Sequence, residues 1–371
     1  MNKNMKSVRL SIGLKYTFFA TLALFFLSIA VLLASIYNRD FCEWYCLGIS
    51  AFIRGILSSV TGFFSFSLAE IVLFLLPVLL IVVVLISARS ALKHTFSFKI
   101  FLVRFCCLLF SAVFLFINAF AICHFRYPIE KQFELDKKEL TSDMLYDAAL
   151  YVKVLAEDAS ANVEFDDSGA SENPHTWDEM NELLSYGYDR LSGDYPFISR
   201  VKAKAKRIIL SPIMTYTHIS GIYVPFTGEA NVNTNYPDYV VSFTMAHEMA
   251  HQRGIAGEDE ANFIAFLACL ASEDEYLVYS AYMNMYDYFL DAAITNERAM
   301  YTSLVENTNN KLLGEMYAYY LFFQEYRHST ASKVADTVND TYLKAMGEDE
   351  GTKSYGKVVE LFCAFMEKYR Y

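Results

Sequence analysis

The sequence predicts a membrane-anchored, mainly α-helical protein whose second part also contains a small β-sheet. Three long apolar runs lie within the first 124 residues. The remaining residues carry charges throughout, and their apolar positions recur every three to four residues, which is typical of helices packed around a core. One stretch, residues 213–233, instead combines β-branched and aromatic residues with two glycines, which indicates two short strands joined by a turn.

The three apolar runs have the length of membrane-spanning helices. They cover residues 16–37, 71–87 and 101–123, and about 20 apolar residues cross a bilayer as a helix. The first run is longer than the core of a signal peptide and lacks a small-residue cleavage site, so we expect it to be retained as an anchor. Residues 42–66 are also apolar, and we expect them to lie in the membrane interface; a fourth crossing is the alternative.

Basic residues predict the orientation of this anchor. Four Lys or Arg precede the first run and three lie between the second and third, whereas the loop after the first run holds two. Because cytoplasmic loops are richer in Lys and Arg, we expect a cytoplasmic amino terminus. After three crossings, a membrane region of residues 1–124 leads into an extracytoplasmic domain of residues 125–371. A fourth crossing would invert this assignment.

The predicted outer domain is acidic. Residues 1–124 hold ten of the 31 Lys and Arg but three of the 42 Asp and Glu, which leaves 21 basic and 39 acidic residues, a net charge of −18, in residues 125–371. A domain of this charge repels a phosphate backbone, which argues against nucleic acid as a partner. The partner that the apolar runs predict is the lipid bilayer.

One stretch of the outer domain, residues 240–262, has the sequence VVSFTMAHEMAHQRGIAGEDEAN. His247 and His251 are four residues apart, so on a helix both imidazoles leave the same face and can bind one cation. Glu248 follows the first histidine and can accept a proton from an attacking water molecule. This H-E-x-x-H arrangement is typical of zinc-dependent hydrolysis of amide bonds. Residues 240–246 hold no charge and no proline, which suits a helix buried around its metal.

A catalytic zinc ion needs a third protein ligand and an open position for water. Three carboxylates open a new helix after the sharp turn that Gly254 permits. We expect Glu258 to bind the metal, with Glu260 as the alternative. Two residues along a helix turn a side chain by about 200°, so only one of these two can face the ion. Asn262, one turn further, can orient a zinc-bound imidazole.

Other residues are candidates for binding the substrate. A hydrogen-bond donor to a developing oxyanion can come from His218, Tyr223 or Tyr355. Residues 227–233 form a candidate strand for pairing with an extended substrate, and a purely structural hairpin is the alternative.

The spacing of apolar residues also predicts helices over most of the outer domain. Tyrosines and phenylalanines recur through the later helices, where we expect them to form the core. The predicted helices cover residues 141–159, 177–191, 197–207, 274–293, 311–328, 333–346 and 355–369.

Several longer segments carry a resemblance to a known family. The apolar amino-terminal runs are followed by GIYVPFTGEANVN, AHEMAHQRG and EDEANFIAFLAC. With these segments the chain resembles, over nearly its whole length, the bacterial membrane proteins grouped as domain of unknown function 3810. The resemblance implies no substrate.

The segment around the two histidines is in turn similar to the glutamate zincins. In several zinc-peptidase families the ligand glutamate opens an E-x-x-A-[D/N] pattern, which Glu258, Ala261 and Asn262 match. This likeness implies a zincin-like α+β metallopeptidase domain that holds Zn²⁺. The roles it implies are metal ligands at His247, His251 and Glu258, and a general base at Glu248.

Together these features predict a membrane-bound zinc metallopeptidase that hydrolyses a peptide or protein substrate outside the bacterial cytoplasmic membrane. Two alternatives remain open. The chain could be a membrane sensor or signal transducer with a peptidase-like outer domain. It could also be a catalytically inactive scaffold that is stabilised by zinc.

Overall fold

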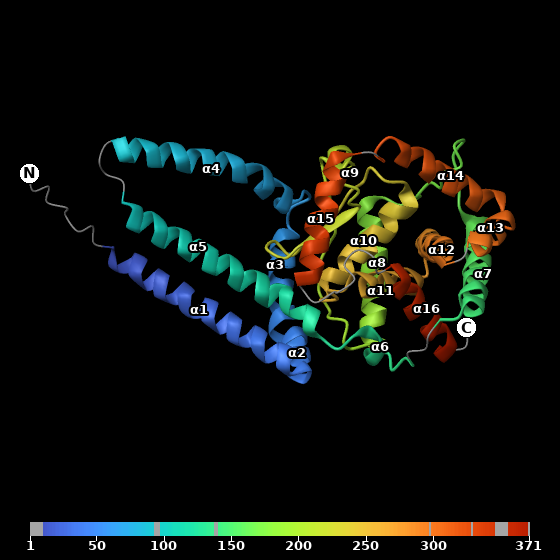
Figure 1. The fold of residues 1–371 in the computed structure, drawn as a ribbon, viewed down its shortest axis with the longest axis horizontal. Helices are drawn as coiled ribbons and strands as arrows, with labels where there is room; N and C mark the ends of the chain where they lie inside the picture. Colours follow the sequence, from blue (N-terminus) through green and yellow to red (C-terminus); the bar gives the residue numbers. More distant parts are fainter. Residues whose placement is uncertain are drawn as a thin grey trace, which may run out of the picture.

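The computed structural model describes residues 10–92, 97–136, 140–296, 298–327, 329–345 and 355–369. In this part of the chain, three long helices project from one side of a bundle of shorter helices (Figure 1). They are α1 (Ile12–Tyr37), α4 (Leu68–Leu92) and α5 (Phe98–Ala119). They correspond to the three apolar runs, and each is long and apolar enough to cross a membrane. The third ends at Ala119 rather than at Cys123, because a 3₁₀ turn (Ala121–Phe125) follows it.

The stretch between α1 and α4 is also helical, and it is a fourth segment long and apolar enough to cross a membrane, Arg39–Thr61. It consists of α2 (Arg39–Tyr45), a π-helical turn (Cys46–Ser50) and α3 (Ala51–Thr61). Asn38 separates it from α1, because its backbone is extended and its side chain accepts a hydrogen bond from the Phe41 N–H. The segment lies across the ends of the long helices, between them and the bundle (Figure 1).

The segment Arg39–Thr61 buries its polar side and exposes its apolar side. Its buried polar residues recur every three to four positions: Ser50, Arg54, Ser58 and Thr61. Three large apolar residues that alternate with them, Phe52, Ile56 and Val60, are 68%, 47% and 55% exposed. A surface helix in water has the opposite arrangement. The exposed face of α3 is therefore suited to lipid rather than to water.

The bundle is built around one helix, α12 (Glu275–Asn296). Its fully buried side chains include Tyr279, Tyr286 and Phe289, so the predicted aromatic core is confirmed here. The other helices are α6 (Ile129–Gln132), α7 (Ser142–Ala159), α8 (Trp177–Asp194), α9 (Ser211–Thr215), α10 (Asp238–Gln252), α11 (Glu258–Ala271), α13 (Arg298–Glu306), α14 (Asn310–Gln324), α15 (Thr330–Ala345) and α16 (Tyr355–Tyr369). Five of them, α7, α10, α11, α13 and α16, pack directly on α12.

The predicted helix at residues 197–207 is wrong. Only the strand β1 (Lys206–Arg207) is regular in this region. Along residues 201–205 the two lysines are exposed and the residues between them are buried. This alternation has a period of two, which is typical of extended chain and not of a helix.

The small sheet has three strands in the order β1-β3-β2. Strands β2 (Gly221–Val224) and β3 (Glu229–Val232) form the predicted hairpin, and β1 pairs with β3 in parallel. β3 is therefore the central strand and all four of its residues are buried. The prediction that residues 227–233 offer an edge to a substrate is thus wrong, because both sides of β3 are already paired.

One of the two edges of the sheet is formed by β2. The Asn233 N–H donates to the Ser220 carbonyl, and Ile222 lies opposite Asn231 in the antiparallel register. Backbone groups alternate in direction along a strand, so those of Gly221 and Tyr223 point away from β3. In the described part of the chain, these groups pair with no other strand.

Candidate metal centre

The candidate metal centre is formed by the carboxyl-terminal half of α10 and the first residue of α11. Between these helices, Gly254 has a φ of +83°, a conformation that favours glycine. Its N–H donates to the His251 carbonyl, and the Ile255 N–H donates to the Ala250 carbonyl, so the turn closes the end of α10. α11 then packs back along α10. This return places Glu258 beside the two histidines.

Three side chains converge at this point, as the sequence predicts. The Nε2 atoms of His247 and His251 are 3.0 Å apart. The Glu258 carboxylate lies 3.2 Å from the first of these nitrogens and 3.7 Å from the second. Two ligands at about 2.1 Å from a tetrahedral zinc ion would be about 3.4 Å apart. The donor set and its spacing therefore fit one zinc ion.

The outer nitrogen of each imidazole is held by an oxygen atom. His247 Nδ1 lies 2.7 Å from Asn262 Oδ1, and His251 Nδ1 lies 2.7 Å from the Ile255 carbonyl oxygen. An oxygen acceptor at Nδ1 favours the tautomer that carries its proton there, which leaves the Nε2 lone pair free to bind a metal. Asn262 thus occupies the position that the sequence predicts for it.

The two candidate carboxylates for the third ligand point to different places. Glu258 reaches the histidines. The Glu260 carboxylate accepts a hydrogen bond from the Ile129 N–H at 2.8 Å, which ties the start of α11 to α6. Of the two, only Glu258 belongs to the group of three ligand atoms that lie within 4.8 Å of one another.

Glu248 lies next to this group in a buried position. Its side chain is 4% exposed, and among the described residues its Oε2 atom has no hydrogen-bond partner. Burial raises the pKa of Glu248 to about 7, against the opposing effect of the two histidines. Gly221 of β2 makes room for it, because a Cβ atom at that position would lie 2.5 Å from Glu248 Oε1. The side chain is thus a desolvated carboxylate with one uncommitted oxygen.

Charge stabilises the cluster of ligands. Burial lowers the pKa of His251, but the Glu258 carboxylate outweighs burial and raises it to about 9. Burial likewise raises the pKa of Glu258, but the two histidines outweigh this effect and hold it well below its ordinary value. The Glu258 carboxylate therefore stabilises positive charge between the two imidazoles. In such an environment a divalent cation can take the place of a proton.

Of the candidate oxyanion donors, Tyr223 lies beside this cluster, with its ring centroid 6.4 Å from that of His251, whereas His218 contacts Phe323 and Tyr326. Tyr223 packs on Phe120, with ring centroids 5.0 Å apart, and its buried hydroxyl has no partner among the described residues. Burial raises its pKa, and the charges that also act on it are those of Arg54 and Cys123. His218 bonds the Tyr326 carbonyl oxygen at 2.9 Å. The side chain of Tyr355 lies outside the described residues.

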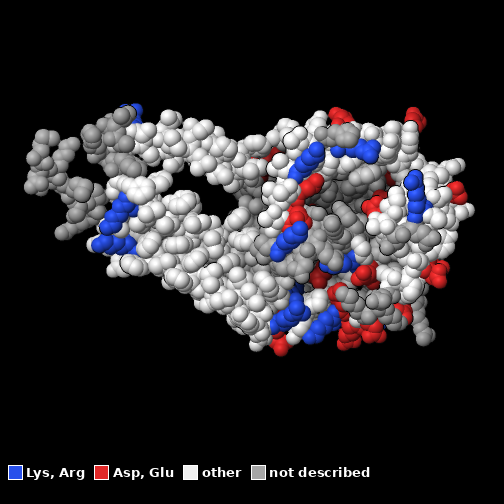
Figure 2. Space-filling model, in the orientation of Figure 1, with Lys and Arg blue, Asp and Glu red and all other residues white. Residues whose placement is uncertain are grey.

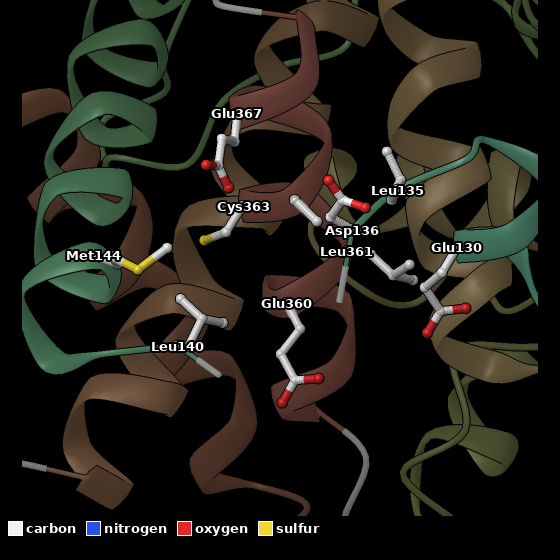
Figure 3. A pocket seen from close by; sticks show the side chains of 10 residues that line it. Glu130, Leu135, Asp136, Leu140, Met144, Glu360, Leu361, Cys363 and Glu367 are labelled. Atoms are coloured by element: carbon white, nitrogen blue, oxygen red, sulfur yellow. The ribbon is translucent and has the colours of Figure 1, made fainter. Parts of the chain in front are cut away.

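A pocket elsewhere in the bundle shares no residue with the metal centre. It lies between α16 and the chain around residues 130–144, with carboxylates at its margin (Figure 3). Its lining residues are Glu130, Leu135, Asp136, Leu140, Met144, Glu360, Leu361, Cys363, Ala364 and Glu367. The histidine motif therefore locates the candidate site, and this pocket does not.

Sequence reasoning missed the buried arginines around the end of α10. Arg253 lies over the ring of Tyr188, with its Cζ atom 3.9 Å from the centroid. Arg126 donates to the Gly254 carbonyl at 3.0 Å and forms an ion pair with Glu43 at 2.8 Å. Arg54 donates to the Gln252 carbonyl. The only sequence signal for Arg54 was its position as a lone charge within an apolar stretch.

Comparison with curated proteins and with solved structures returned no match. The family model described as "Protein of unknown function (DUF3810)" matches residues 45–363. This match includes α3, the sheet, α10 and α11, and so it spans the membrane-side helices as well as the candidate metal centre. The chain therefore belongs to the DUF3810 family.

Proposed function

We propose that this protein is a membrane-anchored, zinc-dependent peptidase. The observation that supports this most directly is the convergence of His247, His251 and Glu258 within 4.8 Å. These residues come from two helices, so the arrangement depends on the fold and not only on a motif. The buried carboxylate of Glu248 beside them supplies the group that amide hydrolysis needs in addition to a metal.

Each residue of the site has a distinct role in this proposal. Bound zinc would polarise the scissile carbonyl and make a water molecule more acidic. Glu248 accepts the proton of the attacking water through its uncommitted Oε2 atom and passes it to the leaving amine. Asn262 and the Ile255 carbonyl keep both imidazoles oriented toward the metal.

The edge of β2 is our candidate for the substrate-binding strand. Gly221 packs against Glu248, so a peptide paired with the outward backbone groups of β2 passes close to the general base. Strand addition of this kind binds an extended chain through main-chain hydrogen bonds, with little demand on its sequence.

For the membrane, we propose three crossings, with Arg39–Thr61 remaining on the side of the bundle. Both ends of this segment are tied there, since Tyr127 Oη donates to Asp40 and Ser58 Oγ donates to the Gly228 carbonyl. On the face in Figure 2, the long helices show an uncharged stretch between the bundle and their far ends. An uncharged stretch between two charged zones suits a bilayer core.

The orientation follows from the far ends of the long helices. These ends carry the basic residues Lys15, Arg89, Lys99 and Arg104. Since basic residues favour the cytoplasmic side, we place the bundle and its metal centre outside the cytoplasmic membrane.

The test uses the full chain, purified in lipid nanodiscs. We expect about one zinc ion per chain by elemental analysis. Glu248→Gln should retain the zinc and lower the hydrolysis of a mixed peptide library at least about 100-fold, because the amide cannot accept the proton. Glu325→Gln, at the end of α14, is the matched control and should retain activity. Wild-type protein without stoichiometric zinc, or unaltered hydrolysis by Glu248→Gln, would contradict the proposal.

A further inference from the structure

We infer that Arg54, on the membrane-side helix α3, is a positioning residue for the metal centre. The inference rests on the proposed function, because it assigns Arg54 to the geometry of the proposed zinc site. Arg54 is 198 positions away from Gln252 in the sequence, yet its Nε atom donates to the Gln252 carbonyl oxygen at 3.1 Å. Gln252 is the last residue of α10, the helix that carries both histidines.

The guanidinium of Arg54 is fully buried and bonded on all sides. No described carboxylate forms an ion pair with it. Besides Gln252, its acceptors are Ser50 Oγ at 2.6 Å, the carbonyl oxygens of Ala119 and Cys46 at 3.3 Å each, Ser199 Oγ at 3.3 Å and Cys123 Sγ at 3.2 Å. These partners come from the π-helical turn before α3, from the end of α5 with the 3₁₀ turn that follows it, and from the chain before β1. One side chain of α3 therefore joins these three parts of the molecule to α10.

The position of this charge has an electrostatic cause. Burying a cation without a counter-ion is costly unless its donors are satisfied. The last carbonyls of a helix carry partial negative charge and have no partner within the helix. Arg54 supplies a positive charge and a donor at this end of α10, which stabilises both the guanidinium and the helix terminus. The arginine and the end of the metal helix therefore depend on each other.

The turn that follows α10 is shaped to the guanidinium. A Cβ atom on Gly254 would lie 2.5 Å from Arg54 Nη2, so the backbone approaches the side chain as closely as glycine allows. The next residue, Ile255, supplies the oxygen that holds His251 Nδ1. Three residues later the same chain delivers Glu258. A shift of Arg54 would thus move one oriented imidazole and the third ligand together.

A second residue on the same face of α3 reinforces this contact. Ser58 Oγ donates to the Gly228 carbonyl at 2.8 Å, and Gln252 Nε2 donates to the same oxygen at 2.9 Å. The hairpin turn at Gly228 is thereby held between α3 and the end of α10. The polar side chains of α3 face α10, and its apolar side chains face outward. By these contacts α3 supports the metal site.

Cobalt substitution in the full chain tests the inference, because the visible spectrum of Co²⁺ reports the geometry of its ligands. The variants are Arg54→Lys and Arg54→Gln. Lys keeps the charge but cannot span the separated acceptors, and Gln removes the charge. We expect Arg54→Gln to weaken Co²⁺ binding about 10–100-fold, an effect of the size seen when a residue that orients a metal ligand is lost. Both variants should alter the d–d bands, with Lys intermediate.

Arg39→Gln is the matched control, because Arg39 belongs to the same segment but is exposed. It should bind Co²⁺ as the wild type does. If the wild type binds no metal, the proposed function itself fails. If the wild type binds Co²⁺ and both Arg54 variants show the same affinity and spectrum, the positioning role is overturned while the proposed function stands. Unfolding of both variants, with Arg39→Gln folded, would also overturn it, because Arg54 would then serve the whole fold.

Discussion

At the scale of single residues, the proposed zinc site depends on atoms that do not touch the metal. Asn262 Oδ1 bonds the outer nitrogen of His247, while a backbone carbonyl does the same for His251. A side chain can be exchanged without altering the fold, whereas a carbonyl cannot. Asn262 is therefore the residue through which this outer layer can be tested.

We predict that Asn262→Ala weakens zinc binding about 10–100-fold, because His247 loses the acceptor that selects its tautomer. Asn262→Asp keeps an oxygen at this position and should bind zinc nearly as well as the wild type. Competition with a chromophoric chelator measures both affinities. Asn307→Ala, an exposed position on the bundle, serves as the control. Equal affinities for Asn262→Ala and the wild type would remove Asn262 from the site.

At the scale of elements, the central helix α12 carries a carboxyl group where it packs against α10. Tyr239 Oη donates to Asp287 at 3.0 Å and so joins α10 to α12. Burial raises the pKa of Asp287 from 3.8 to about 8. The folded protein thus holds this proton more tightly than the unfolded chain. The hydrogen bond from Tyr239 favours the charged carboxylate, but burial outweighs it and favours the neutral acid.

This shift predicts how stability depends on pH. Because the pKa is higher in the folded state, the stabilising effect is complete below about pH 4 and decreases as pH rises toward about 8, by at most about 1.4 kcal/mol per pH unit. Asp287→Asn keeps an acceptor for Tyr239 and does not titrate. Its melting temperature should therefore decrease less than that of the wild type between pH 5 and 8.

Thermal unfolding of both proteins in the same detergent measures this difference. Asp336→Asn, at an exposed position on α15, should behave as the wild type does. If Asp287→Asn loses stability with pH as steeply as the wild type, Asp287 is not the group responsible.

At the scale of the whole molecule, the segment Arg39–Thr61 links the long helices to the bundle. Its apolar face is exposed and its polar face is buried against the end of α10 and the hairpin. If the segment stays on the outer side of the membrane, its two ends lie on the same side. A transmembrane segment would place them on opposite sides.

We predict that Arg39→Cys and Phe63→Cys are labelled alike by a membrane-impermeant maleimide added to intact cells. Lys202→Cys should react in the same way, and Lys15→Cys should react only after the membrane is opened. The unaltered chain is the control, because its cysteines in the bundle and in α2 are buried. Labelling of Arg39→Cys without Phe63→Cys would show that the segment crosses the membrane.

The sequence by itself determined the features that depend on neighbouring residues. The four-residue spacing of His247 and His251 places both on one helix face, because helix geometry is local. The length of the apolar runs and the hairpin of β2 and β3 follow from similarly short-range patterns. Glu258 could be chosen over Glu260 only as an expectation, because the side of α11 that meets the histidines depends on how α11 packs against α10.

The tertiary structure alone decided what distant parts of the chain do to one another. β3 is the central strand because it also pairs with β1. The alternation at residues 201–205 indicates extended chain, but it does not predict that this chain lies beside β3. The contact of Arg54 with Gln252 joins residues 198 positions apart. No periodic pattern encodes such a contact, because a buried cation finds its acceptors only when separate helices have packed around it.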